Sequence, residues 1–100
     1  MKRKLFSLAL GAVFTLAAMP AAAECYADYK AKRDNPLRLH YGVIELPDAA
    51  CGSHEAAASE IAERIGGDGW TLLDVVSIFG AADLDDDKRK ESAGDYYLRY

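Results

Sequence analysis

The sequence contains few of the residues that cross-link a small chain or carry out chemistry. Its 100 residues include two cysteines, two histidines, three prolines and one tryptophan. Cys25 and Cys51 are too far apart to form the C-x-x-C pair of a redox enzyme. Together with His40 and His54 they show none of the spacings typical of metal ligands. We therefore expect neither a metal site nor a bound cofactor.

Long uncharged stretches are also scarce, and the most extended one lies at the beginning of the chain. Three basic residues at positions 2–4 precede the apolar run Leu5–Met19, which is followed by Pro20 and three alanines. A basic head, a short apolar body and small residues at the end are typical of a secretory signal peptide. We predict that residues 1–23 form this peptide and that it is cleaved between Ala23 and Glu24.

Two other roles for the leader are less consistent with its residues. An uncleaved membrane anchor needs about 20 apolar residues, whereas this run is shorter and contains Gly11 and Thr15. Lipidation of Cys25 requires a small residue directly before the cysteine, and Glu24 occupies that place. We expect a periplasmic or secreted protein with no stable membrane anchor after cleavage.

Positive charge is scarce in the remaining 77 residues. The leader carries three positive charges, so its removal lowers the net charge from −4 to −7, with nine basic and 16 acidic residues. An acidic surface repels the phosphates of nucleic acids and anionic lipid head groups. We therefore exclude nucleic acid as a partner and expect an unknown protein or a small ligand.

The two cysteines are predicted to form a structural disulfide. Export places them in a compartment where disulfides persist, and a domain of this size buries a limited core. In the chain-entropy model, closing a loop of about 26 residues stabilises the fold by about 3 kcal/mol. The Cys25–Cys51 bridge would also hold the N-terminal segment to the domain.

Four segments of the mature chain show patterns that predict secondary structure. In residues 24–36, acids come early and bases late, which favours a short helix from Glu24 to Arg33 that ends at Asn35-Pro36. Residues 37–46 alternate as in a strand. Residues 53–65 form an amphipathic helix with Ser53 as its N-cap and Gly66 as its left-handed C-terminal residue. Residues 70–79 are apolar on both faces, as in a central strand.

The C-terminal part is less regular. Residues 80–95 are polar, and the stretch 84–93 is consistent both with an exposed helix and with a mobile loop. Residues 96–100 alternate as a last strand. A crossover through the helix would make strands 37–46 and 70–79 parallel. The predicted fold class is α+β: a βαββ domain over residues 37–100, with a small three-stranded mixed sheet, one main helix on one face, and a short N-terminal helix attached by the disulfide.

The segment Asp68–Leu73 (DGWTLL) lies between the predicted helix and strand. It resembles a small bacterial family of domains of unknown function, whose members have a helix followed by an E-G-W-E-L-V-like strand and a final aromatic-rich strand. The resemblance covers residues 37–100. It implies a βαββ fold, and it brings no known activity and no catalytic residues. Trp70 is expected to be a core residue in any case.

Candidate chemistry is sparse. Asp83, Asp85 and Asp87 resemble the start of a calcium-binding loop, but Lys88 and Gly94 stand where that loop needs Gly and Glu, which favours a solvated run of charge. Histidine titrates near neutral pH, so a small hydrolase or metal-dependent enzyme using His40 or His54 is the alternative function. We predict no catalytic residues, because no nucleophile pairs with either histidine.

Tyrosines provide the main candidate binding surface. If their strands are neighbours, the aromatic rings form a platform that stacks on a ligand or a protein; otherwise they stabilise the sheet by cross-strand packing. We predict a non-catalytic binding or accessory module, with a homodimer through a sheet edge as a variant. The residues of the predicted binding face are Tyr41, Tyr96, Tyr97 and Tyr100.

Overall fold

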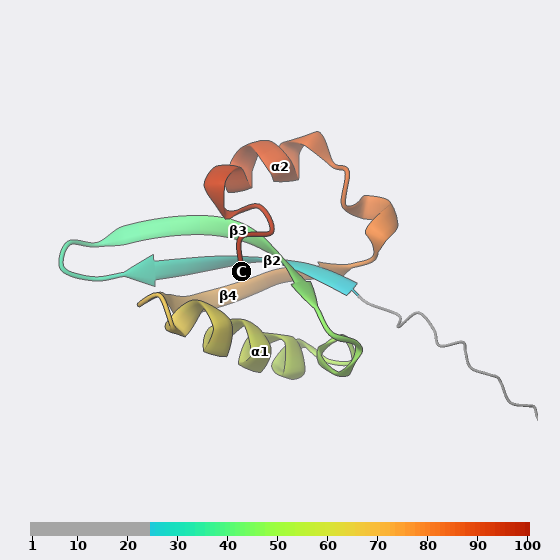
Figure 1. Cartoon of the computed structure of the whole chain (residues 1–100), viewed down its shortest axis with the longest axis horizontal. Coiled ribbons are helices and arrows are strands. Elements are labelled where there is room, and N and C mark those ends of the chain that lie inside the picture. Colours follow the sequence, from blue (N-terminus) through green and yellow to red (C-terminus); the bar gives the residue numbers. More distant parts are fainter. Residues whose placement is uncertain (1–24) are drawn as a thin grey trace, which may run out of the picture.

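A three-stranded antiparallel sheet lies between two helices in the computed structural model, which describes residues 25–100 (Figure 1). Strands β2 (Cys25–Arg33), β3 (Arg38–Leu46) and β4 (Thr71–Phe79) are arranged in the order β3-β2-β4. Helix α1 (His54–Gly66) covers one face of the sheet, and helix α2 (Asp87–Ala93) lies over the other. The α+β class is confirmed. The predicted signal peptide and its cleavage site lie outside the described residues.

The central strand β2 is the segment that we predicted to be a short helix, and that prediction is wrong. Ala27, Tyr29 and Ala31 alternate along β2 and are fully buried against α1. Favourable charge order along a helix contributes less than about 1 kcal/mol. Pairing β2 with a strand on each side satisfies its backbone along its length, and the small alanines allow α1 to pack closely.

The position of β2 changes the rest of the topology. β4 is an edge strand and not the central one, and β3 and β4 run in the same direction without touching because β2 separates them. The sheet is therefore antiparallel and not mixed. Residues 96–100 do not form the predicted strand: a 3-10 turn (Gly94–Tyr96) precedes an isolated bridge between Tyr97 and Val43. The Leu98 amide donates to the Val43 carbonyl at 2.8 Å.

Both helices begin at a capping side chain. The Ser53 hydroxyl accepts a hydrogen bond from the Ala56 amide at 3.0 Å, as the sequence predicts for α1. The left-handed residue that follows this helix is Gly69, with φ of 85°, and not Gly66, which is the last helical residue. The segment 84–93 contains α2, capped by the Asp86 carboxylate at the Lys88 amide (2.9 Å). The helical alternative for this segment is therefore correct.

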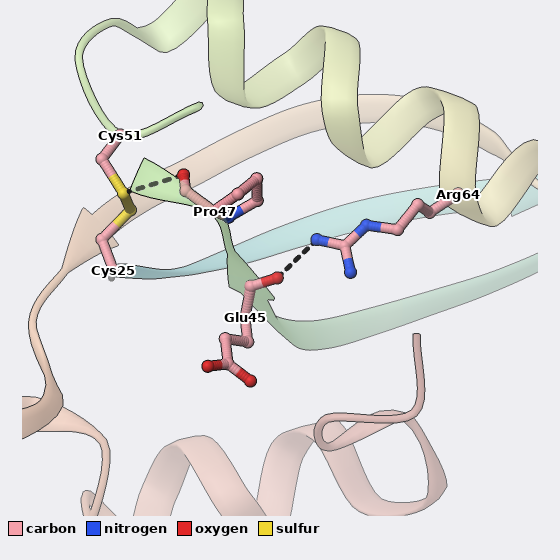
Figure 2. Close-up of a disulfide and its surroundings, with 5 residues drawn as sticks. All are labelled: Cys25, Glu45, Pro47, Cys51 and Arg64. Carbon is pink, nitrogen blue, oxygen red and sulfur yellow. Dashed lines mark hydrogen bonds between the residues drawn. A yellow bond between two sulfur atoms is a disulfide. The ribbon is translucent and has the colours of Figure 1, made fainter. Parts of the chain in front are cut away.

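The predicted disulfide is confirmed and closes the end of the sheet next to α1 (Figure 2). It joins Cys25 at the start of β2 to Cys51, which follows the 3-10 turn Asp48–Ala50, and the two Cα atoms are 5.9 Å apart. Arg64 of α1 donates to the Glu45 carbonyl of β3. A disulfide such as Cys25–Cys51 is characteristic of an oxidising compartment outside the cytoplasm. Between residues 25 and 100, no helix is long and apolar enough to cross a membrane.

Candidate functional site

An aromatic cluster surrounds His40 on the α1 side of the sheet. The His40 ring stacks on Tyr96 with ring centroids 3.7 Å apart, and it meets Trp70 edge to face at 4.3 Å. Its Nε2 lies 2.9 Å from the Tyr29 hydroxyl. His40 is 8% exposed, so the cluster is part of the core. We define the aromatic cluster by five residues: Tyr29, His40, Trp70, Tyr96 and Tyr100.

A glycine makes the Tyr29–His40 contact possible. Tyr29 of β2 faces Gly42 of β3 in the strand register. A Cβ atom at position 42 would lie 2.5 Å from the Tyr29 hydroxyl oxygen and 2.6 Å from the ring carbon that carries it. Because glycine has no side chain, the Tyr29 ring lies across β3 and reaches the imidazole two residues earlier in that strand.

The surroundings of His40 keep its imidazole neutral. Burial lowers the pKa of His40 to about 4, and the positive charges of Arg33 and Arg99 contribute to the shift. The Arg33 guanidinium lies 4.2 Å from the centre of the Trp70 ring. The Nδ1 atom of His40 is buried without a hydrogen-bond partner among the described residues. A buried neutral imidazole of this kind packs as an aromatic ring.

His54 has a different environment. It is the first residue of α1, and its Nε2 donates to the Val75 carbonyl of β4 at 2.8 Å, which holds the beginning of the helix to the sheet. In residues 25–100, neither His40 nor His54 hydrogen bonds to a carboxylate, and no group of three or more metal-ligating side chains is arranged around a common point. The structure gives both histidines structural contacts.

The aspartates of the predicted solvated charge run lie around the beginning of α2. Asp85 forms an ion pair with Lys90 at 3.3 Å, and Asp86 forms one with Arg89 at 3.6 Å. Asp83 lies in a separate 3-10 turn, Ala81–Asp83. The acids are therefore partly neutralised by basic side chains from the same segment.

The four tyrosines of the predicted binding face do not form one surface. Tyr96 and Tyr100 pack on the α1 side, whereas Tyr41 and Tyr97 pack on the α2 side. The hydroxyls of Tyr41, Tyr97 and Tyr100 donate to Asp28 (2.7 Å), the Leu84 carbonyl (3.2 Å) and Asp68 (2.6 Å). Their contacts are those of residues that stabilise the fold.

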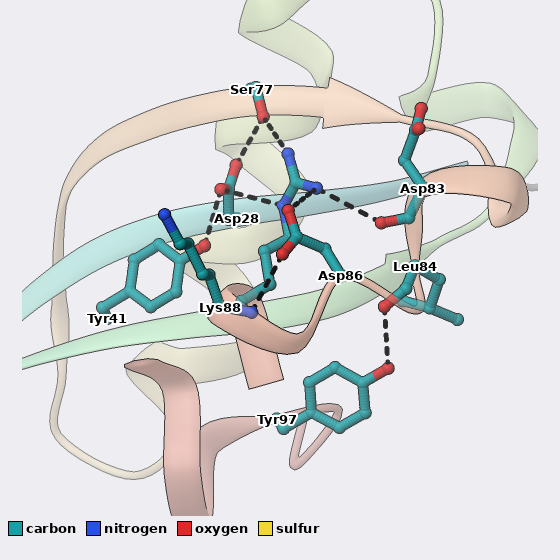
Figure 3. Close-up of polar contacts among 9 residues, drawn as sticks. Asp28, Tyr41, Ser77, Asp83, Leu84, Asp86, Lys88 and Tyr97 are labelled. Carbon is teal, nitrogen blue, oxygen red and sulfur yellow. Dashed lines mark hydrogen bonds and ion pairs between the residues drawn. The ribbon is translucent and has the colours of Figure 1, made fainter. Parts of the chain in front are cut away.

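Asp28, which the sequence analysis did not single out, anchors α2 on the sheet (Figure 3). The residue is 4% exposed, and its carboxylate accepts hydrogen bonds from Tyr41 at 2.7 Å, Ser77 at 2.6 Å and Arg89 of α2 at 3.3 Å. Burial alone would raise the pKa of Asp28, but the Ser77 and Tyr41 hydrogen bonds and the Arg89 charge outweigh it, so the pKa is lowered. The group is a buried carboxylate with a structural role.

The same face of the sheet is open beyond α2. A groove of about 260 Å³ lies there, and two exposed leucines border it: Leu39 of β3 is 67% exposed and Leu73 of β4 is 52% exposed. We define the open half-face by Lys30, Leu39, Tyr41 and Leu73. Of these four residues, only Tyr41 belongs to the binding face predicted from the sequence. The full lining of the groove is Lys30, Ala31, Leu39, His40, Tyr41 and Leu73.

Leu73 is exposed because β4 is irregular. The pairing of β2 with β4 shifts between Lys30 and Ala31, which face Asp74 and Leu72, so Leu73 is the extra residue of a bulge. A bulge re-aims a side chain relative to the regular alternation. The apolar pattern of residues 70–79 suggested two covered faces, and the sequence contains no signal that locates the bulge.

Comparisons with protein-family models, with curated proteins and with solved structures find no match for this chain. The resemblance of residues 68–73 to the βαββ family therefore stays a prediction. The two features of the candidate site are a closed aromatic cluster on one face of the sheet and an open apolar groove with a lysine on the other.

Proposed function

We propose that this protein is exported to the periplasm or secreted, and that it works there as a non-catalytic binding or accessory module. Its contact surface is the open half-face. The observation that carries the proposal is the pair of exposed leucines, Leu39 and Leu73, on either side of a groove in a sheet face whose other half is covered by α2. The disulfide and the predicted signal peptide support the compartment.

The two leucines border the same groove from the two edge strands of the sheet. Neighbouring strands lie about 4.8 Å apart, so Leu39 on β3 and Leu73 on β4 are separated by about 10 Å across β2. Single exposed leucines are common on protein surfaces. An apolar groove that also contains a few polar groups is instead typical of an interaction site, and Lys30 of the central strand and the partly buried Tyr41 are the polar groups here.

A sheet edge is a weaker candidate surface. The outer edge of β3 is partly occupied by the C-terminal segment, which bonds to Val43. β4 has two register shifts and an exposed acid, Asp74, and both features oppose pairing with another strand. The homodimer through an edge is therefore less well supported than docking on the face.

The alternative function, a small hydrolase or metal-dependent enzyme, has less support in the geometry. A catalytic histidine needs access to substrate and a group that orients it. The His40 ring is enclosed by Tyr29, Trp70 and Tyr96, and His54 bonds to a backbone carbonyl. These contacts explain both residues without a reaction.

Site-specific photo-cross-linking tests the binding proposal. A benzoyl-phenylalanine at Leu39 in the full chain, expressed in the organism that encodes it, is expected to give a discrete cross-linked species. The matched control carries the same group at Glu63, an exposed position of α1 on the other side of the sheet. Cross-links of equal yield from both positions, or none from Leu39, would contradict the proposal.

A further inference from the structure

We propose that the open half-face binds a segment of another protein that carries a large apolar side chain next to an acidic one. This inference rests on the proposed function and specifies its partner. The apolar side chain fills the groove between Leu39 and Leu73, and the carboxylate meets the Lys30 ammonium on the central strand.

The size of the groove favours a side chain over a separate small molecule. Sites that enclose small-molecule ligands have volumes of about 300–1,000 Å³ and bury most of the ligand, whereas this groove holds about 260 Å³ and is open. Leu39 and Leu73 extend the apolar surface beyond the groove itself. One anchor side chain in a pocket, surrounded by flatter contacts, is the usual arrangement at the centre of a protein interface.

The charge distribution favours an acidic partner. Residues 30–38 contain four basic residues and one acid, a local net charge of +3 in a chain whose net charge from Glu24 onward is −7. Lys30 and Arg38 take part in none of the ion pairs among residues 25–100. Their hairpin projects beyond both helices (Figure 1). An acidic segment is therefore repelled by most of the molecule and attracted to this end.

Asp74 partly opposes this attraction and provides a test of it. It faces Lys30 in the register of β2 with β4 and is exposed, and no ion pair joins the two residues. A carboxylate that approaches Lys30 therefore also approaches Asp74. Neutralising Asp74 should strengthen the binding of an acidic segment, whereas it would weaken the binding of a basic one.

A second copy of the chain fits the groove less well. Its α2 region supplies exposed acids, among them Asp85 and Asp87, that complement Lys30. However, the large apolar side chain of this region, Leu84, is partly buried against the cluster of Val43 and Phe79, and α2 itself (DKRKESA) contains none that could fill the groove. Self-association is therefore an outcome of the test and not part of the proposal.

The inference is tested with a displayed library of random twelve-residue peptides, selected on the full mature protein with its disulfide intact. We expect the enriched peptides to share a Leu, Phe or Trp within three positions of an Asp or Glu. Affinity of one such peptide should fall about fivefold in Lys30→Glu, fall at least about tenfold in Leu73→Asn, and rise about twofold in Asp74→Asn. The control, Lys88→Glu on the exposed surface of α2, should leave it unchanged.

The remaining outcomes show whether the acidic partner alone fails or the proposed function fails with it. Enriched peptides that are basic or neutral, or affinity that Lys30→Glu does not change, overturn the acidic partner; if Leu73→Asn still abolishes binding, the open half-face remains the contact surface. Absence of any enrichment, or binding insensitive to Leu73→Asn, counts against both. Sedimentation of the protein alone as a dimer that Leu73→Asn dissociates would assign the groove to a second copy and overturn the inference.

Discussion

At the scale of single residues, two buried polar groups are accommodated in opposite ways. Asp28 remains charged because three donors surround its carboxylate, whereas His40 remains neutral because it is enclosed by aromatic rings and lies near Arg33 and Arg99. The free energy of unfolding should therefore decrease in acid for two separate reasons. Protonation of His40 in the unfolded chain acts first, near neutral pH, and protonation of Asp28 acts at lower pH.

The first prediction concerns His40 and the pH dependence of stability. Its pKa is about 4 in the folded protein and about 6.5 when unfolded. Between these values the unfolded chain binds the extra proton, so the contribution of His40 is complete above about pH 6.5 and is lost as the pH falls towards 4. The expected loss is about 2–3 kcal/mol, measured by urea unfolding at pH 7.5 and pH 4.5.

A non-titrating variant isolates this effect. His40→Phe keeps an aromatic ring between Tyr96 and Trp70 and removes the titration, so its stability should change much less over the same pH range. The contribution of Asp28 is retained in this variant and accounts for what remains. An equal pH dependence in wild type and His40→Phe would show that the lowered pKa of His40 is not the cause.

At the scale of elements, the strand β2 shows why part of the fold was not predictable. Its residues Ala27, Tyr29 and Ala31 alternate with polar ones, but alanine has no preference for strands and the charge order is that of a helix. The partners that make it a strand, Gly42 and Val75, lie 13 and 46 positions from Tyr29. By contrast, α1 and β3 carry their periodicity and caps within their own residues, and both were predicted.

The candidate site was harder to predict than the fold for a related reason. The sequence identifies Cys25 and Cys51 as a pair because only two cysteines are present. It does not show that Asp28 accepts hydrogen bonds from residues 13, 49 and 61 positions further along the chain. It also does not show that α2 covers half of a face and leaves Leu39 and Leu73 exposed. Both features depend on which elements become neighbours.

The second prediction concerns the attachment of α2 to the sheet. Asp28 and Arg89 form an ion pair at 3.3 Å, in which the Asp28 side chain is 6% exposed and the Arg89 side chain 21%. Removing the Asp28 carboxylate leaves the Tyr41 and Ser77 hydroxyls without their acceptor. Arg89 then keeps only its more exposed ion-pair partner, Asp86. Asp28→Ala should destabilise the protein by about 2–3 kcal/mol and increase hydrogen exchange in residues 87–93 more than in α1.

The matched control for α2 is Asp85→Ala. Asp85 pairs with Lys90 on the surface, where its side chain is 89% exposed, so its removal should cost less than about 0.5 kcal/mol. If Asp28→Ala loosened α1 and α2 equally, the carboxylate would stabilise the sheet as a whole, and its specific role in holding α2 would be contradicted.

At the scale of the whole molecule, the two faces of the sheet differ in how well they are covered. The α1 face contains the larger core with Tyr29, Ile44, Ile61 and Trp70, and the other face has a smaller cluster around Val43 and Phe79. A small chain gains limited stability from such a core. Because the open half-face buries little apolar surface, the stability of the domain depends more strongly on the disulfide between β2 and the loop before α1.

The third prediction measures that link. The Cys25–Cys51 bond closes a loop with a sequence separation of 26 residues, and its loss should lower the free energy of unfolding by about 3 kcal/mol in the chain-entropy model. For a domain of this size, the melting temperature should fall by roughly 10–20 °C. Cys25→Ala, Cys51→Ala and the double variant should lose similar amounts, because each removes the same cross-link. A much larger loss in Cys25→Ala alone would attribute the effect to packing of the Cys25 side chain, which is 8% exposed, and not to the closed loop.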